Sequence, residues 1–107
     1  MTNHHKPIED CELWDVLDWD TVARLALGAT GDPRDDHGRN ALAWTAKRLI
    51  DATDDAAAWN CFHDIIVTYI RSGKPAVRRQ EAGELAGFFG ADPVRLIAYI
   101  KVKRGGL

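Results

Sequence analysis

Apolar residues recur every three or four positions along most of this chain, in runs that glycine, proline and aspartate interrupt. This spacing follows one face of an α-helix, which repeats every 3.6 residues. The β-branched run 65–68 could form a strand, but it lies within a longer helical pattern. The sequence therefore predicts an all-α fold, a compact bundle of five or six short helices.

The interruptions set the expected bounds of the helices. Residues 10–27 form two short helices or one helix kinked at Trp19-Asp20, with Asp18 and Asp20 available as caps. A loop over 28–38 precedes a helix over 40–53 and a central, most buried helix over 54–72. Pro75 begins a helix that runs to Phe89, and a last helix covers 93–103.

The expected core faces follow from the same spacing. In 40–53 the apolar face comprises Leu42, Ala46, Leu49, Ile50 and Thr53. In 54–72 it comprises Trp59, Phe62, His63, Ile66, Tyr69 and Ile70, widened by Ile65 and Val67. With 107 residues the chain fits one domain over 10–104, between a flexible terminus at 1–9 and a loose tail at 105–107.

The length of the apolar runs and the use of cysteine bear on location. No apolar run approaches the roughly 18 residues that a membrane span needs, and no signal peptide opens the chain. Cys11 and Cys61 are too few for a disulfide framework. We expect a cytoplasmic protein with reduced thiols and no membrane partner.

Charge is distributed unevenly along the chain. Residues 1–38 hold nine acids and three bases, a net charge of −6, whereas residues 71–107 hold eight bases and three acids, a net charge of +5. A basic end favours an anionic partner, and an acidic end repels nucleic acid and attracts basic protein surfaces. Alternatively, the two ends face one another within the fold.

No catalytic or metal-binding motif is present. Cys61 and His63 are two residues apart, so on a helix they point about 200° from one another and cannot share a metal ion. His63 falls on the apolar stripe, where a hydrogen-bonded core residue is expected. The sequence has no nucleophile elbow, no zinc-protease motif and no phosphate-binding glycine loop. We expect a protein that is not an enzyme and that needs neither a cofactor nor a metal.

Residues 82–101 have the pattern of two helices that cross at a tight turn. Leu85 and Phe89 are apolar, Ala86 is small where the helices would cross, and Gly90 occupies the turn, where a positive φ is wanted. Leu96 and Tyr99 fall where the second helix would pack inward, and Asp92-Pro93 resembles its cap and first turn. Over these 20 residues the chain resembles the helix-turn-helix motif.

The resemblance implies DNA binding by the second helix, and the basic residues around it support phosphate contacts. The candidate nucleic-acid-binding residues are Arg78, Arg79, Arg95, Lys101, Lys103 and Arg104. The outward positions Pro93, Val94, Ile97 and Ala98 offer no hydrogen bonds to base edges, so binding would be independent of base sequence. This apolar face could equally pack on the rest of the domain, as plain scaffold, or on a second copy in a homodimer.

Tryptophan suggests a second function. Trp14 and Trp19 lie among acids, and Trp44 is expected on a charged face beside Arg48. Interfaces are enriched in Trp and Arg, so these four residues are candidates for a protein–protein interface, unless another helix covers Trp44. The alternative function is then an inhibitor or adaptor. Small phage and plasmid proteins, including anti-CRISPR proteins, resemble this chain in size and in having no recognisable active site.

Overall fold

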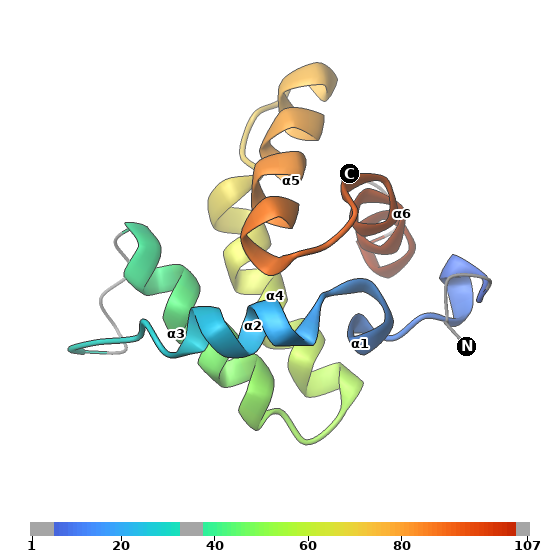
Figure 1. The fold of residues 1–107 in the computed structure, drawn as a ribbon. Coiled ribbons are helices and arrows are strands. Elements are labelled where there is room, and N and C mark those ends of the chain that lie inside the picture. Colours follow the sequence, from blue (N-terminus) through green and yellow to red (C-terminus); the bar gives the residue numbers. More distant parts are fainter. Residues whose placement is uncertain (1–5, 33–37, 105–107) are drawn as a thin grey trace.

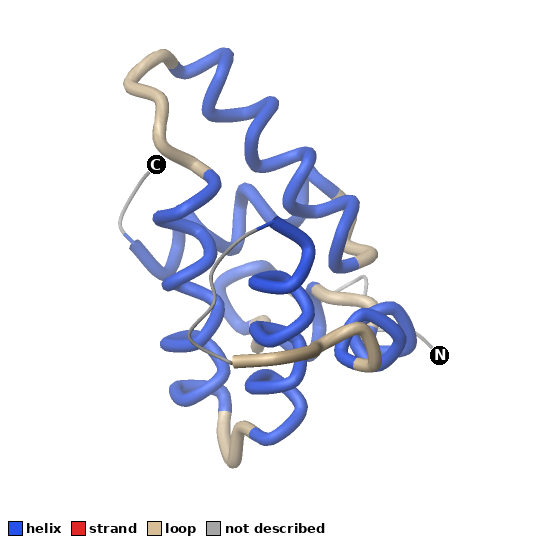
Figure 2. Tube along the Cα trace, turned by 90° about the vertical axis from the view of Figure 1, so that its left-hand side faces the viewer, coloured by secondary structure: helices blue, strands red, loops and turns tan. Residues whose placement is uncertain are grey.

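The computed structural model describes residues 6–32 and 38–104. Within them a short 3-10 helix precedes six α-helices, and no strand is present (Figures 1 and 2). In chain order they are η2 (Ile8–Asp10), α1 (Leu13–Val16), α2 (Trp19–Ala26), α3 (Gly38–Asp51), α4 (Asp55–Tyr69), α5 (Pro75–Phe89) and α6 (Pro93–Arg104). The prediction of an all-α bundle is confirmed. Among the described helices, none combines the length and the hydropathy that crossing a bilayer requires.

Asp18 separates the first two α-helices. Its backbone is extended, its carboxylate accepts a hydrogen bond from the Thr21 N–H at 3.3 Å, and the Thr21 hydroxyl also bonds to it. Its own N–H donates to the Phe89 carbonyl at 3.2 Å. Asp20 lies in the first turn of α2, where its charge complements the helix dipole. Of the two alternatives for this segment, two separate helices form.

The core face of α3 differs in part from the prediction, since Leu42, Ala46 and Leu49 are buried as expected and two other residues are not. Ile50 is 47% exposed and Thr53 is also exposed, whereas Ala43 and Thr45 are buried. The physical reason is that α2 packs extensively along α3 and covers a side that the apolar spacing did not indicate. The helix also begins at Gly38, two residues earlier than expected.

Helix α4 ends three residues earlier than predicted, at Tyr69. The N–H groups of Arg71 and Ser72 donate instead to Oε1 of Glu81, each at 3.2 Å, and this carboxylate replaces the helical hydrogen bonds. Val67, which was expected to widen the apolar stripe, is 46% exposed. Trp59 and His63 are half-buried at the edge of the core, their rings 5.6 Å apart.

The turn between α5 and α6 forms as the sequence predicts. Gly90 has a φ of 69°, in the left-handed region, and caps α5. The Asp92 carboxylate accepts from the Arg95 N–H at 3.2 Å and caps α6. A Cβ atom at Gly90 would lie 2.7 Å from Cβ of Asp18 and from Oγ1 of Thr21, so the start of α2 packs directly on this turn. The five residues that carry the apolar and small-residue pattern around the turn are buried: Leu85, Ala86, Phe89, Leu96 and Tyr99.

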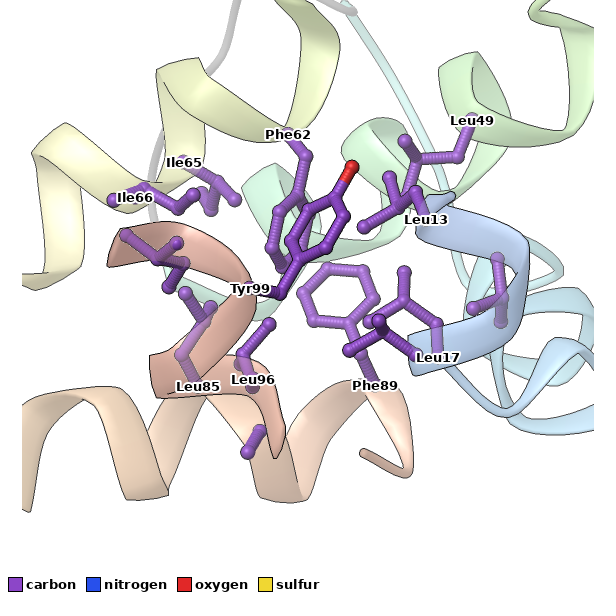
Figure 3. Close-up of a cluster of buried hydrophobic side chains, with 14 of the residues drawn as sticks. Leu13, Leu17, Leu49, Phe62, Ile65, Ile66, Leu85, Phe89, Leu96 and Tyr99 are labelled. Carbon is purple, nitrogen blue, oxygen red and sulfur yellow. The ribbon is translucent and has the colours of Figure 1, made fainter. Parts of the chain in front are cut away.

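All six α-helices contribute side chains to the core, and Figure 3 shows the part of it around Tyr99 and Phe89. The rings of Phe62 and Phe89 meet edge to face with centroids 5.2 Å apart. Tyr99 is fully buried, and its hydroxyl has no hydrogen-bond partner among the described residues. Burial raises the pKa of Tyr99 well above its ordinary value, and the charge of Asp55 adds to the effect.

The ends of the chain were expected to be loose. Lys6 nevertheless pairs with Asp15 at 3.1 Å, and Ile8 packs against the core, so residues 6–10 follow a defined path over α6. His4-His5, part of the expected loop at residues 33–37, and the tail at 105–107 lie outside the described residues.

Candidate functional site

Two of the six candidate basic residues act inside the fold. Nη2 of Arg95 lies 3.3 Å from the Cys11 sulfur, on the side of α6 that η2 covers. Nζ of Lys103 lies 3.3 Å from Oδ2 of Asp55 and 5.5 Å from the ring centroid of Tyr99. The other Asp55 oxygen accepts the Leu13 N–H at 2.7 Å, so this carboxylate joins α1, α4 and α6. Arg95 and Lys103 therefore have structural partners.

Three other candidates come together in one pocket. Arg78 and Arg79, from the start of α5, and Lys101, near the end of α6, line a pocket of about 220 Å³. Its remaining described lining residues are Gly73, Pro75 and Ile97. Arg104 is exposed on the last turn of α6, where the structure gives it no place in this pocket. We call the site lined by these six residues the basic pocket.

The α4–α5 connection fixes the position of Arg78. Its Nη1 donates to the Ser72 carbonyl at 3.1 Å, and its Nε–H is buried with no partner in the described part of the chain. The Ser72 hydroxyl accepts the Lys74 N–H at 3.0 Å, and Glu81 holds the N–H groups of Arg71 and Ser72. The guanidinium is therefore held in place before any ligand arrives.

The basic pocket is electrostatically one-sided. Its described lining holds three bases and no acid. Arg79 and Lys101 are exposed, so their charged groups are free to approach a ligand, whereas Arg78 is half-buried. Cations that converge on a concave surface raise the local concentration of anions. The arrangement is suited to binding an anion.

The tryptophans predicted for an interface all have intramolecular roles. Trp14 and Trp19 stack with ring centroids 4.7 Å apart, and the Trp19 indole N–H donates to the Trp14 carbonyl at 3.1 Å. Trp44 is half-buried: its indole N–H donates to the Thr30 carbonyl at 3.0 Å, and Lys47 lies 4.9 Å from the ring centroid. The residue that accepts this hydrogen bond from Trp44 lies in the connection after α2, whereas the sequence suggested that a helix could cover it. Arg48 is exposed on the same helix.

Sequence reasoning missed a second hollow, of about 440 Å³, between α2 and α3. Arg24 and Arg39 line it together with Thr30 and Asn40, whose side-chain oxygen accepts the Thr30 N–H at 2.9 Å. The two arginines are 15 positions apart, in a part of the chain where acids predominate. No local signal in the sequence could have paired them.

The acidic and basic ends of the chain are neighbours in the fold. Helix η2 and helix α1 lie against α6, and α2 lies against α5 (Figure 1). Acidic and basic segments that are far apart in the sequence therefore lie partly against one another within the molecule. Among the described residues, no three side chains of His, Cys, Asp or Glu gather closely enough to hold a metal ion.

Comparison of the chain with protein-family models, with curated proteins and with solved structures gives no match. The function is therefore inferred from the side chains described above.

Proposed function

We propose that this chain is a cytoplasmic, non-enzymatic protein that binds nucleic acid through its phosphates, with α5 and α6 acting as a helix-turn-helix-like pair. The observation that carries the proposal is the convergence of Arg78, Arg79 and Lys101 from these two helices on one pocket. Charge-assisted hydrogen bonds from Arg and Lys to phosphate oxygens are strong and need no base contact.

The outer face of α6 supports binding that is independent of base sequence. Val94 is 74% exposed and Ala98 is half-buried, and neither side chain can form a hydrogen bond to a base edge. Three cations, Arg78, Arg79 and Lys101, lie beside this face in the basic pocket, and Arg104 is exposed on the last turn of the same helix. Figure 1 shows α5 from the side and α6 nearly end-on, so the chain changes direction sharply between them, after the α5 cap Gly90, as between the two helices of such a pair.

The salt dependence of binding tests the proposal. We expect a fluorescently labelled DNA duplex to bind with a slope of log K against log salt between about −0.9, if the three cations share one phosphate, and about −2.7, if each pairs with its own. Affinity should then fall by roughly 3-fold to 40-fold between ~50 and ~200 mM salt. The double variant Arg79→Glu/Lys101→Glu should abolish binding; Arg78 is left intact because it holds Ser72.

The matched control is Arg24→Glu/Lys47→Glu, which changes the net charge equally at residues outside the basic pocket. Its binding should stay within about threefold of the unmodified protein, the residual effect being long-range electrostatics. Equal loss of binding in both double variants would show that net charge alone attracts DNA. Absence of binding at ~50 mM salt would refute the proposal outright.

The alternative function, a protein–protein inhibitor or adaptor of the anti-CRISPR type, has less support. Each of Trp14, Trp19 and Trp44 has an intramolecular contact that accounts for its position. No feature of the described surface favours a particular protein partner over the phosphate ligand proposed for the basic pocket.

A further inference from the structure

We propose that the basic pocket is built for a phosphate monoester, the terminal phosphate of a nucleic-acid strand or of a free nucleotide, in preference to an internal phosphodiester. The inference rests on the proposed function, because it assigns a ligand class to the same three cations. It makes a separate claim about selectivity, which can fail while nucleic-acid binding stands.

The first argument is how the cations are arranged. A duplex carries its phosphates in a row along each strand, one charge every ~3.4 Å of helix axis, and a protein that follows this row spreads its cations along a surface. Here Arg78, Arg79 and Lys101 all line one pocket of about 220 Å³. Three positive side chains that line one pocket are matched to a ligand that concentrates negative charge.

The second argument is the chemistry of the ligand. A phosphate monoester carries about −1.5 to −2 charges at neutral pH and has three terminal oxygens that accept hydrogen bonds. A phosphodiester carries a single charge on two such oxygens. The pocket can supply one donor group from each of three side chains, with Arg78 already fixed by its bond to the Ser72 carbonyl. A separate donor for each of three oxygens favours the monoester.

The third argument is the shape and polarity of the walls. A cavity of ~150 Å³ accommodates a benzene molecule, so about 220 Å³ has room for a phosphate group and part of the sugar that bears it. Pro75 and Ile97 add aliphatic surface beside the cations. Gly73 adds no side chain, and a Cβ atom there would meet nothing within 4 Å. An anion attached to a less polar group fits this combination.

Binding to matched oligonucleotides tests the inference. The probes are one duplex with 5′-phosphate ends, the same duplex with 5′-hydroxyl ends, and a nucleoside 5′-monophosphate with its nucleoside as control. We expect the 5′-phosphorylated duplex to bind at least about tenfold more tightly than the hydroxyl form. The monophosphate should bind measurably and the nucleoside should not; equal affinities for these two would contradict the inference.

The variants Arg79→Gln and Lys101→Gln should each remove the preference for the phosphorylated end. Lys101→Arg, which keeps the positive charge, should retain it. Both positions are exposed, so the fold should survive, which circular dichroism checks. Lys47→Gln, with the same loss of charge on α3, should keep the preference. A preference retained in Arg79→Gln and Lys101→Gln would place the ligand elsewhere and overturn the inference.

The outcomes separate the two proposals. Equal, salt-sensitive binding of both duplexes would overturn the monoester inference and leave nucleic-acid binding in place. Binding of the monophosphate without binding of any duplex would support the monoester site and overturn nucleic-acid binding. Absence of binding to every probe would overturn both. If the pocket cations strengthen binding of the free monophosphate alone, the source of the ligand is a nucleotide. If they also strengthen binding of the phosphorylated duplex end, the source is a strand terminus.

Discussion

Replacing Gly90 with alanine places a methyl group where the α5–α6 turn meets the start of α2. Gly90 has a φ of 69°, and the added Cβ would lie 2.7 Å from Cβ of Asp18 and 2.9 Å from Cβ of Thr21. A Cβ atom moves only with its backbone, so rotation of these side chains cannot relieve the contact. Asp18 is also bound to this turn through its N–H, which donates to the Phe89 carbonyl.

The magnitude of the effect follows from two costs. An alanine in the left-handed region costs roughly 1–2 kcal/mol. Overpacking of a close contact adds roughly 1–3 kcal/mol. We therefore expect Gly90→Ala to lower the free energy of unfolding by about 2–5 kcal/mol, out of a total of roughly 5–15 kcal/mol. Because each kcal/mol shifts the midpoint of a domain of this size by about 4–8 °C, Tm should fall by ~10 °C or more.

The assay is urea and thermal unfolding followed by circular dichroism. The matched control is Gly87→Ala, within α5, where a Cβ would meet nothing within 4 Å. It should stabilise the protein by about 0.5–1 kcal/mol, because alanine favours the helix over glycine. If Gly90→Ala costs less than ~1 kcal/mol, or if the two variants shift stability in the same direction, the description of the turn and of its contact with α2 is wrong.

Two further stability predictions concern the core and the first helix break. Tyr99→Phe should leave stability unchanged or raise it by about 1 kcal/mol in urea unfolding, because the buried hydroxyl has no partner among the described residues; a loss above ~1 kcal/mol would indicate a partner. Since the pKa of Tyr99 is raised in the folded state, the unfolded chain releases this proton first, near pH 10, and stability falls above that pH; Tyr99→Phe should reduce this alkaline loss. Asp18→Ala should lower the unfolding free energy by ~1 kcal/mol through loss of the α2 cap, whereas Asp20→Ala should change it by under ~0.5 kcal/mol. Equal effects of the two aspartate variants would argue against Asp18 as the cap.

Predictions from the sequence were most accurate where local chemistry determines the structure. Pro75, Gly90 and the Asp92-Pro93 pair each favour one backbone conformation, and the bounds of α5 and the start of α6 follow from them. The buried face of α3 depends instead on which neighbour covers it. Ile50 continues an apolar spacing and is still 47% exposed, because α2 packs on another side of the helix.

The same distinction applies to the candidate site. The excess of bases after residue 70 indicates an anionic partner, but it does not show which of the six basic side chains lie together in the fold. Arg95, Lys101 and Lys103 lie within three turns of one helix, yet Arg95 reaches Cys11, Lys103 reaches Asp55 and only Lys101 lines the basic pocket with the α5 arginines. Which direction each one faces depends on where η2, α4 and α5 pack around α6, and that arrangement is tertiary.

The positions of the individual basic side chains matter because the whole chain carries a net charge of −2. A molecule of this charge repels a polyanion at long range, so binding has to come from a local excess of cations within roughly one Debye length, about 8–10 Å at physiological salt. The ion pair of Lys103 with Asp55 removes one candidate from that excess, and Arg95 is held against Cys11 away from the basic pocket. The three cations left in the basic pocket are what the nucleic-acid proposal depends on, and the fold brings them together without an acid in the described lining. Binding of an anionic ligand would therefore depend on how the fold brings these three cations together, and not on the overall composition of the chain.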